Sequence, residues 1–274
     1  MKEQMEGAFE EKLLDIVRKE KHLEEVLIQE TDSRLLYYLS PIRQNVLRWF
    51  DFDKEASLLE IGAEYGAITG LFCENVKQVV AIESSEKSAF INKTRNDKFS
   101  NLEVCVGEFS NIKLEQKFDY ITVIGSLEFP YLDMLKKAKS MLNPGGKLLL
   151  AIENKYGMKY WAGAPDDHTG KLFDSIQGYD AQDRAHTLSK GRLKVLLKEA
   201  GFEQQAFYYP VPDYKMPMEI YSEKQLPKPG DIRNISPAYD KARYEMFDER
   251  LAYSSVCEDG LFEEFANAFI VVCE

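Results

Sequence analysis

Residues 58–70 read LLEIGAEYGAITG, and this stretch decides the fold of the chain. An apolar run ends at the acid Glu60 and passes directly into three glycines, Gly62, Gly66 and Gly70. Glycine adopts positive φ angles without steric cost and lets another group approach the backbone closely. The pattern therefore predicts a buried strand, a tight turn and the start of a helix, with a ligand near the turn.

Short apolar runs and amphipathic runs alternate on both sides of this turn. Strands are expected at 57–62, 78–83, 102–107, 118–125, 147–153, 203–212 and 268–273, and helices at 66–74, 85–95, 132–141 and 190–200. We interpret the NPGG sequence at 143–146 as a turn and the Tyr-Pro run at 208–217 as an extended edge strand. This alternation predicts an α/β fold with a doubly wound, Rossmann-like sheet of seven strands.

The chain is expected to consist of two parts. Helical periodicity before the first strand predicts an N-terminal helical extension at 1–50, followed by one large domain at 51–274. Within that domain, residues 153–189 have no clear periodicity and follow the fifth strand. An irregular insertion at 213–265, with a charged helical part near 238–251, precedes the last strand.

Composition excludes several function classes. The chain has 274 residues and a formal net charge of -11, so phosphate backbones would repel it and no nucleic-acid partner is expected. The four cysteines show no CxxC spacing and the three histidines lie far apart, so no metal is expected. No run is apolar enough for membrane insertion, and the charged N-terminus does not look like a secretory signal. A cytoplasmic location is therefore expected.

The spacing of the glycines narrows the choice of ligand. Dinucleotide-binding turns have the pattern G-x-G-x-x-G, whereas this turn has glycines four residues apart. Phosphate groups bind where bare N–H groups and positive potential meet, but Glu60 and Glu64 place carboxylates here. The turn therefore favours a ligand that has no phosphate and carries positive charge.

The stretch LEIGAEYGAITG resembles motif I of the class I S-adenosylmethionine-dependent methyltransferases, E/D-x-G-x-G-x-G. Glu60, Gly62 and Gly66 occupy the first, third and seventh places of that motif. Glu64 stands where the family has its middle glycine. This departure would narrow the pocket and weaken cofactor binding, or would bring the carboxylate to the ligand's amino group or to the helix end. The resemblance implies the class I methyltransferase fold and S-adenosylmethionine as cofactor.

The resemblance also implies which residues contact the cofactor. The acid at the end of the second strand, Glu83, would accept hydrogen bonds from the two ribose hydroxyls. Residues after the third strand would meet adenine, and those after the fourth would frame the methyl donor. The implied cofactor-binding residues are Glu60, Gly62, Ala63, Glu64, Gly66, Glu83, Ser84, Glu108, Phe109, Gly125 and Ser126.

The segment at 153–189 is expected to supply the substrate side. It is similar to a methyltransferase subgroup associated with bacterial polysaccharide glycosyltransferases. His168 is a candidate general base with Asp167, beside Asp166, as its orienting acid, because a hydroxyl needs a positioned base. A surface turn at this place is the alternative. The candidate substrate-binding residues are Glu153, Asn154, Tyr160 and Trp161, although both aromatic residues would also suit a core under a long loop.

Three functions remain open from the sequence. The first is methyl transfer from S-adenosylmethionine to a small molecule or glycan, most simply O-methylation in bacterial surface polysaccharide biosynthesis. The second is a methyltransferase-like binding or scaffold protein in which Glu64 impairs catalysis. The third is an NAD-dependent sugar oxidoreductase, against which the glycine spacing argues. A homodimer or an association with a glycosyltransferase is a further expectation.

Overall fold

The computed structural model describes residues 2–19, 23–30, 32–179, 185–233, 235 and 243–274. The chain divides into two compact units. The first unit comprises residues 1–123 and 141–146, and the second comprises residues 124–140 and 147–274. The predicted domain boundary at residue 50 stays a prediction, since the two units of the structure are divided at other positions in the chain.

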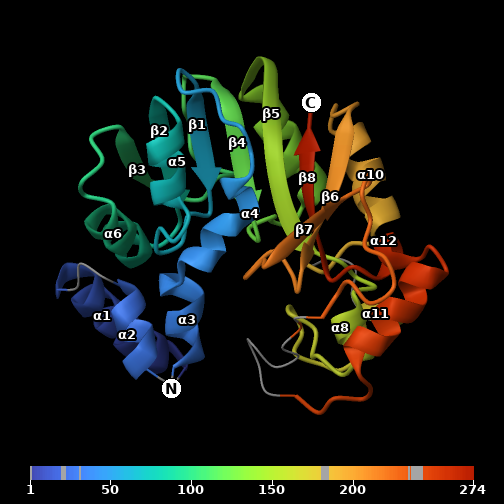
Figure 1. Cartoon of the computed structure of the whole chain (residues 1–274). Helices are drawn as coiled ribbons and strands as arrows, with labels where there is room; N and C mark the ends of the chain where they lie inside the picture. The colour runs from blue at the N-terminus through green and yellow to red at the C-terminus, as the bar shows by residue number, and fades with distance from the viewer. Residues whose placement is uncertain (1, 20–22, 31, 180–184, 234, 236–242) are drawn as a thin grey trace. The chain divides into compact units, whose positions relative to one another are not determined.

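The first unit begins with helices and continues as an alternating α/β structure (Figure 1). Its parallel strands have the order β3-β2-β1-β4, and Leu59 of β1 pairs with Val80 of β2 and with Ile121 of β4. The elements are α1 Lys2–Lys19, α2 Leu23–Gln29, α3 Ser33–Leu39, η1 Pro41–Gln44, α4 Asn45–Arg48, β1 Ser57–Ile61, α5 Thr69–Asn75, β2 Gln78–Glu83, α6 Glu86–Arg95, β3 Leu102–Val106 and β4 Phe118–Ile124.

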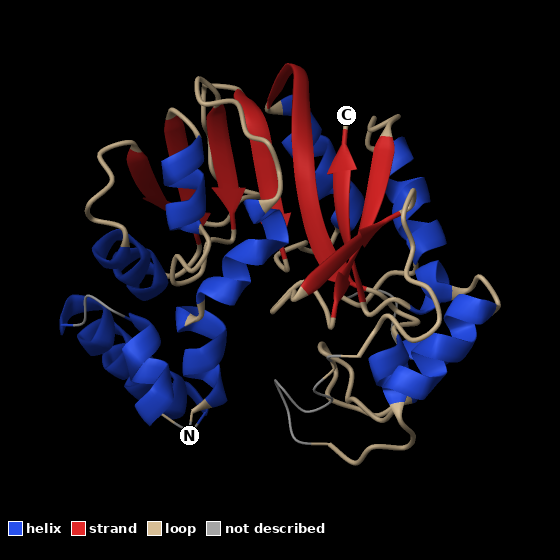
Figure 2. Cartoon of the chain, viewed as in Figure 1, coloured by secondary structure: helices blue, strands red, loops and turns tan. Residues whose placement is uncertain are grey.

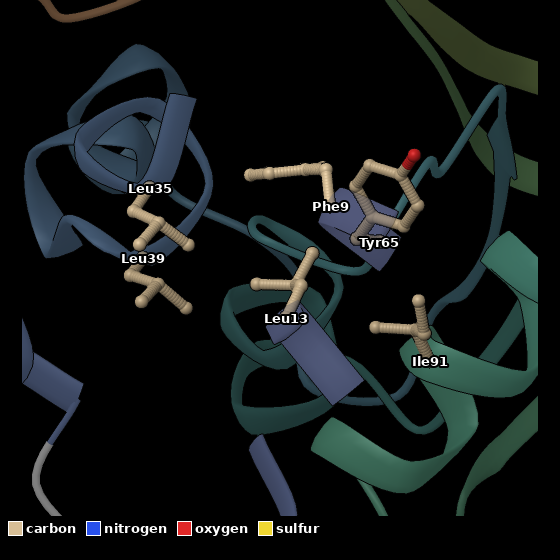
Figure 3. Close-up of a cluster of buried hydrophobic side chains, with 6 residues drawn as sticks. All are labelled: Phe9, Leu13, Leu35, Leu39, Tyr65 and Ile91. Carbon is tan, nitrogen blue, oxygen red and sulfur yellow. The ribbon is translucent and has the colours of Figure 1, made fainter. Parts of the chain in front are cut away.

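The N-terminal helices pack against the α/β part of the first unit. Phe9 and Leu13 of α1 are buried together with Leu35 and Leu39 of α3. The same cluster contains two side chains from outside these helices, Tyr65 of the glycine turn and Ile91 of α6 (Figure 3). The predicted helical extension therefore shares a hydrophobic core with the segment that carries the glycines.

The second unit contains an antiparallel group of strands. Their order is β5-β8-β6-β7, with β8 between β5 and β6. Residues 154–179 and 185–188 are mostly loop (Figure 2), interrupted by two short helices. The elements are α7 Tyr131–Ser140, β5 Leu142–Glu153, which starts in the first unit, α8 Met158–Trp161, α9 Asp174–Gln177, α10 Lys190–Glu199, β6 Gln205–Val211, β7 Glu219–Ser222, α11 Glu249–Glu258, α12 Phe262–Phe265 and β8 Ala268–Cys273.

The α/β prediction is confirmed, but the number of strands is corrected. The sequence predicts seven strands, and the described residues contain eight, because the insertion contributes β7. This strand pairs with β6, so Tyr208 and Tyr209 do not lie on an edge as predicted. Within the insertion, residues 236–242 lie outside the described part, and α11 begins only at Glu249.

Two further boundaries differ from the sequence prediction. The helix after the glycine turn begins at Thr69 rather than Gly66, because the preceding residues still form turns. The predicted turn at 143–146 lies inside β5. A Cβ on Gly146 would lie 3.0 Å from the carbonyl oxygen of Asp119 and 3.1 Å from that of Phe118. Glycine is therefore needed there for close backbone approach to β4 rather than for a turn.

Candidate functional site

The glycine turn after β1 combines three positive φ angles within five residues. Gly62 has a φ of 72° and Gly66 a φ of 75°, and Glu64 between them has a φ of 47°. The backbone N–H groups of Gly62 and Ala63 both donate to the carbonyl oxygen of Ile82 in β2. The turn is thus fixed to the neighbouring strand through its own backbone.

Glu64 places its backbone N–H against the acid that ends β2. The N–H donates a 2.6 Å hydrogen bond to Oε2 of Glu83, while the Glu64 side chain is exposed. A left-handed conformation costs a non-glycine residue about 1–2 kcal/mol. The middle position of the motif therefore keeps the left-handed backbone that glycine would adopt, and a glutamate carries the strain.

Glu60 is buried and does not supply the negative charge expected of it. Its Oε2 accepts a 2.6 Å hydrogen bond from the Thr69 hydroxyl, which in turn accepts one from Asn92. Burial raises the pKa of Glu60 to about 8; the Thr69 hydrogen bond opposes this rise and Glu83 adds to it. At neutral pH Glu60 is mainly protonated, so the carboxylates available to a cation in this turn are those of Glu64 and Glu83.

Gly66 serves a contact within the protein. A Cβ at this position would lie 2.3 Å from Oδ1 of Asn92 and 2.7 Å from Nδ2 of Asn96. Asn92 lies on α6, and Asn96 caps the C-terminal end of this helix. Asn96 also donates to the carbonyl oxygen of Gly66 across 3.3 Å. Gly66, at the seventh place of the motif, therefore brings the turn against α6, the helix that follows Glu83.

The other predicted cofactor residues of the first unit lie at the carboxyl ends of β2 and β3. The backbone N–H of Gly107 donates to the carbonyl oxygen of Glu83 and joins these two strand ends. Beyond it, Phe109 is buried, while Ser84 lies 3.5 Å from the Glu83 carboxylate through its hydroxyl. The carbonyl oxygen of Glu108 accepts backbone hydrogen bonds from the turn that follows.

These residues fit S-adenosylmethionine. The Glu83 carboxylate is an acceptor of a kind that suits a ribose diol, and the exposed carboxylate of Glu64 is of a kind that suits a positively charged ligand. Gly62, which has a left-handed backbone, begins the turn without a β-carbon, and this permits close approach to the backbone there.

In the second unit, Gly125 follows β4 and lies against an aromatic side chain. A Cβ on Gly125 would lie 2.5 Å from the hydroxyl oxygen of Tyr214, and the glycine N–H donates to the carbonyl oxygen of Ala151 in β5. The Tyr214 hydroxyl donates a 3.0 Å hydrogen bond to Oε1 of Glu153, at the end of β5. Gly125 and Glu153, both predicted site residues, are thus joined through a tyrosine, and Ser126 is the residue that follows Gly125.

An array of buried charges continues from Glu153. The ammonium group of Lys215 lies 3.4 Å from Oε1 of Glu153 and 2.9 Å from Oδ1 of Asp167. The other oxygen of Asp167 lies 3.0 Å from the ammonium of Lys159 and 2.7 Å from the hydroxyl of Tyr160. Buried ions of both signs are costly unless they are paired, and such clusters are more frequent at functional sites than elsewhere.

Lys159 and Asp167 hold each other in the charged form. Burial raises the pKa of Asp167, but Lys159 and Lys215 outweigh this effect and the pKa is strongly lowered. Burial lowers the pKa of Lys159, but the carboxylates of Asp167, Asp213 and Glu153 together outweigh burial, and the pKa is raised overall. Asp167 is therefore a fixed negative charge between two cations.

The predicted pair of His168 and Asp167 lies in two different surroundings. His168 is exposed, and its backbone N–H donates a 2.9 Å hydrogen bond to the buried side chain of Asp166. Asp166 also accepts from Thr169 N–H, so it closes a turn. The carboxylate of Asp167 instead contacts lysines. The catalytic roles of His168 and Asp167 stay predictions, and the turn that was the alternative is present.

The candidate substrate-binding residues differ in what their side chains already bind. Tyr160 is buried on Asp167, whereas Trp161 is 39% exposed and its ring lies 6.4 Å from that of Phe265. Asn154 is buried, and its amide donates to the backbone oxygens of Glu264 and Ala266. Its side chain thus supports the fold, which leaves Glu153 and Trp161 as the better placed of the four.

Sequence reasoning missed Lys159, Tyr214 and Lys215. The sequence signal that could have identified Tyr214 and Lys215 is the polar run that begins at Asp213, shortly after the end of β6. Ligand sites in α/β folds lie beyond the carboxyl ends of strands. The Tyr-Pro pattern assigns that run to an edge strand. The array becomes visible only when β5, β6 and the loop carrying Asp167 are placed together.

Residues 33–206 match the protein family described as "Methyltransferase domain". The match covers more than half of the chain. The chain belongs to the methyltransferase domain family. This membership confirms the predicted class I methyltransferase resemblance and S-adenosylmethionine as the cofactor of the family. It does not test the residues assigned to the site.

A curated relative agrees with this family. An uncharacterized methyltransferase of Staphylococcus carnosus is 34% identical over 103 residues, which cover 35% of this chain and 46% of the relative. The chain thus matches about half the length of that curated relative.

Two solved structures share the fold. A S-adenosylmethionine-dependent methyltransferase of Thermotoga maritima, a possible histamine N-methyltransferase, is 17% identical with a TM-score of 0.51, covering 92% of this chain and 98% of its own. A Haloferax volcanii methyltransferase, solved in complex with the Trm112 activator, is 12% identical with a TM-score of 0.52, covering 85% and 87%. At these identities the likeness shows the fold alone.

Proposed function

We propose that this protein transfers a methyl group from S-adenosylmethionine to a hydroxyl of a small molecule or glycan. The observation that carries the cofactor half of the proposal is the carboxylate of Glu83, held by the backbone N–H of Glu64 at the end of β2. When bound, the cofactor supplies an activated methyl group on a positively charged sulfur. The chain's own residues have to bind, orient and keep water from that group.

The cofactor is assigned to the glycine turn and to residues that follow the predicted strands. Glu83 would accept hydrogen bonds from the ribose hydroxyls, and the side chain of Glu108 with the backbone N–H of Phe109 would meet the adenine. Glu64 would offer its exposed carboxylate to the ammonium group. The proposed cofactor-binding residues remain Glu60, Gly62, Ala63, Glu64, Gly66, Glu83, Ser84, Glu108, Phe109, Gly125 and Ser126, with Glu60 acting mainly as a neutral hydrogen-bonding group at neutral pH, since burial raises its pKa to about 8.

The acceptor is assigned to residues of the second unit. Glu153 carries a carboxylate whose one oxygen is held by Tyr214 and Lys215, and this suits a group that has to bind a hydroxyl. His168, exposed on the neighbouring loop, is the other candidate for proton removal. Trp161 offers an exposed ring of the kind that stacks on sugars.

The biological setting is proposed from the subgroup resemblance of residues 153–189. We place the reaction in the cytoplasm and in bacterial surface polysaccharide biosynthesis, with a homodimer or a glycosyltransferase as the protein partner. Among the helices that the structure describes, none is both long and apolar enough to cross a bilayer.

Calorimetric titration of the purified protein separates the proposed function from its alternatives. Micromolar binding of S-adenosylmethionine and S-adenosylhomocysteine, without binding of NAD, is expected. Binding of NAD alone would overturn the proposal in favour of the oxidoreductase, and binding of none of the three would favour the scaffold. Incubation of bacterial glycans and small hydroxylated metabolites with cofactor labelled in its methyl group, followed by mass spectrometry, then identifies the acceptor.

A further inference from the structure

Tyr65 lies inside the glycine turn, between two residues whose backbone is already fixed. Its N-terminal neighbour Glu64 donates its N–H to Glu83, and its C-terminal neighbour Gly66 is pressed against Asn92 of α6. The direction in which the Tyr65 side chain leaves the turn is therefore set by the turn itself. Tyr65 directly follows the residue whose backbone N–H is bonded to Glu83.

The ring of Tyr65 is buried among the N-terminal helices rather than in the α/β core (Figure 3). Its centroid lies 6.2 Å from that of Phe9 on α1 and 4.6 Å from that of Tyr38 on α3, both in edge-to-face arrangements. Such aromatic pairs contribute about 0.5–1.5 kcal/mol beyond their buried area. The ring thus connects the turn with two helices that precede it in the chain.

The hydroxyl of Tyr65 adds a polar connection to α1. Its oxygen lies 3.2 Å from Oε1 of Glu6 and 3.3 Å from Oε1 of Glu10, on successive turns of that helix. Burial raises the pKa of Tyr65 well above its ordinary value, and Glu10 and Glu6 raise it further, so the hydroxyl stays a donor. The hydroxyl has a single hydrogen, so it donates to one of the two carboxylates at a time.

The same face of α1 also contacts α6. Lys87 of α6 lies 3.2 Å from Oε2 of Glu10 and donates to the carbonyl oxygen of Gly7 across 3.1 Å. Because α6 begins directly after Ser85, it continues from the strand end that carries Glu83. Helix α1 is therefore attached on both sides of Glu83, through Tyr65 before it in the chain and through Lys87 after it.

We propose that Tyr65 is a positioning residue that couples the docking of α1 to the binding of the S-adenosyl cofactor at Glu83 and the glycine turn. Ordering of the turn by the ligand holds the Tyr65 hydroxyl against Glu6 and Glu10, and docking of α1 in turn holds the turn in its binding conformation. Such coupling is reciprocal by thermodynamic necessity. The inference rests on the proposed assignment of the cofactor to this turn.

The test compares Tyr65→Phe with wild-type protein, using S-adenosylhomocysteine as the probe. Titration calorimetry is expected to show affinity weakened about 5-fold, at the lower end of the usual range for coupling between two sites. Hydrogen exchange of the amides in α1 is expected to slow when the probe saturates the wild-type protein, and to slow much less in Tyr65→Phe. Tyr221→Phe, which removes a hydroxyl bonded to Glu219 in β7, is the matched control and should bind as wild type does.

A second variant tests the coupling from the other end. Glu6→Ala with Glu10→Ala removes both acceptors of the Tyr65 hydroxyl and also the ion pair of Glu10 with Lys87, so it is expected to weaken probe binding by at least the same factor. Combining it with Tyr65→Phe should add little, because the same interaction is already lost.

The outcomes separate the coupling from the proposed function. If the wild-type protein does not bind the probe, the cofactor assignment fails and the coupling with it. If wild type binds but both variants bind equally well and keep probe-induced protection of α1, then Tyr65 only stabilises the fold and the coupling is overturned. A lowered melting temperature with unchanged affinity would overturn the coupling in the same way.

Discussion

The backbone N–H of Glu64 and the side chain of Glu83 form a 2.6 Å hydrogen bond between the glycine turn and the end of β2. The bond is made from the left-handed backbone at Glu64, whose φ is 47°. Among the described residues, Oε1 of Glu83 has only long contacts, to Ser84 and Ser85. One oxygen of the carboxylate thus fixes its orientation, and the other is better placed to accept from a ligand.

Replacing Glu64 by glycine is expected to stabilise the protein. Glu64→Gly relieves the left-handed strain but makes the unfolded chain more flexible, so a net gain of about 0.5–1 kcal/mol in unfolding free energy is expected. Glu64→Ala keeps the strain and should show no gain. Urea denaturation of the three proteins measures the difference. A gain in the alanine variant equal to that in the glycine variant would place the effect in the carboxylate rather than in the backbone.

Removing the Glu83 carboxylate is expected to abolish cofactor binding. Glu83→Ala deletes the acceptor of the ribose hydroxyls and the partner of Glu64, and two charge-assisted hydrogen bonds predict at least a roughly 100-fold loss of affinity. Glu83→Gln keeps an oxygen for the Glu64 N–H and should lose less, about 10-fold. Calorimetry with S-adenosylhomocysteine gives both values. Undiminished affinity in Glu83→Ala would mean that the cofactor lies elsewhere.

Gly66 and Gly145 provide a matched pair of substitutions to alanine. Both have similar positive φ angles, 75° and 79°, but only Gly66 of the two faces other described atoms where a Cβ would be. Gly145→Ala should therefore cost the left-handed penalty alone, about 1 kcal/mol, and Gly66→Ala should cost about 1–3 kcal/mol more. Thermal unfolding reports both. Equal losses of stability in the two variants would show that α6 shifts readily to accommodate the added methyl group.

Glu60 is expected to make stability fall as the pH rises. Its pKa in the folded protein is about 8 and its ordinary value is 4.5, so the folded state binds a proton that the unfolded chain releases between these values. Stability from this group is present below about pH 4.5 and is lost progressively up to about pH 8. Glu60→Gln should gain on wild type by on the order of 1 kcal/mol per pH unit in this window.

Urea denaturation at several pH values tests this prediction. The exposed Glu74 of α5 supplies the control, since Glu74→Gln removes a carboxylate that is not buried. The control should follow the wild-type curve at every pH. Parallel curves for Glu60→Gln and wild type would show that Glu60 is ionised throughout.

Asp167 and His168 are adjacent, but their substitution should affect stability very differently. Asp167→Asn leaves the ammonium groups of Lys159 and Lys215 without their shared carboxylate, at a cost of about 3 kcal/mol. His168→Ala removes an exposed ring and should change stability by less than about 0.5 kcal/mol, with S-adenosylhomocysteine binding intact. Denaturation and calorimetry measure the two effects. Turnover lost in a stable His168→Ala would support its role as base; turnover retained there would exclude it.

Much of the fold is predictable because its strands are short, apolar and separated by helices. The range 78–83 is predicted to the residue, since the burial of β2 is nearly complete. Strand β7 is missed because EIYS is only half-buried and carries no apolar run. The sequence does not predict that β5 runs through NPGG, because proline and glycine usually indicate a turn. Here Gly146 is needed instead for close contact with the backbone of β4.

The site is predictable where one segment carries its geometry, and not where it depends on distant segments. The glycine turn contains its own positive φ angles, so Gly62 and Gly66 can be identified from their spacing. The contact of Lys215 with Asp167 joins residues 48 apart, and no local periodicity marks it. The adjacency of Asp167 and His168 in sequence suggests a pair, but neighbouring residues on a turn project in different directions.

Strand β7 has a consequence for the behaviour of the protein in solution. It pairs with residues 208–211 of β6, whose backbone would otherwise be open to pairing with another molecule. Because β7 is only four residues long, its own free edge offers few backbone hydrogen-bonding groups to another molecule. This short strand therefore limits edge-to-edge aggregation. Shortening the loop that carries it is expected to reduce the solubility of the protein before it reduces the rate of catalysis.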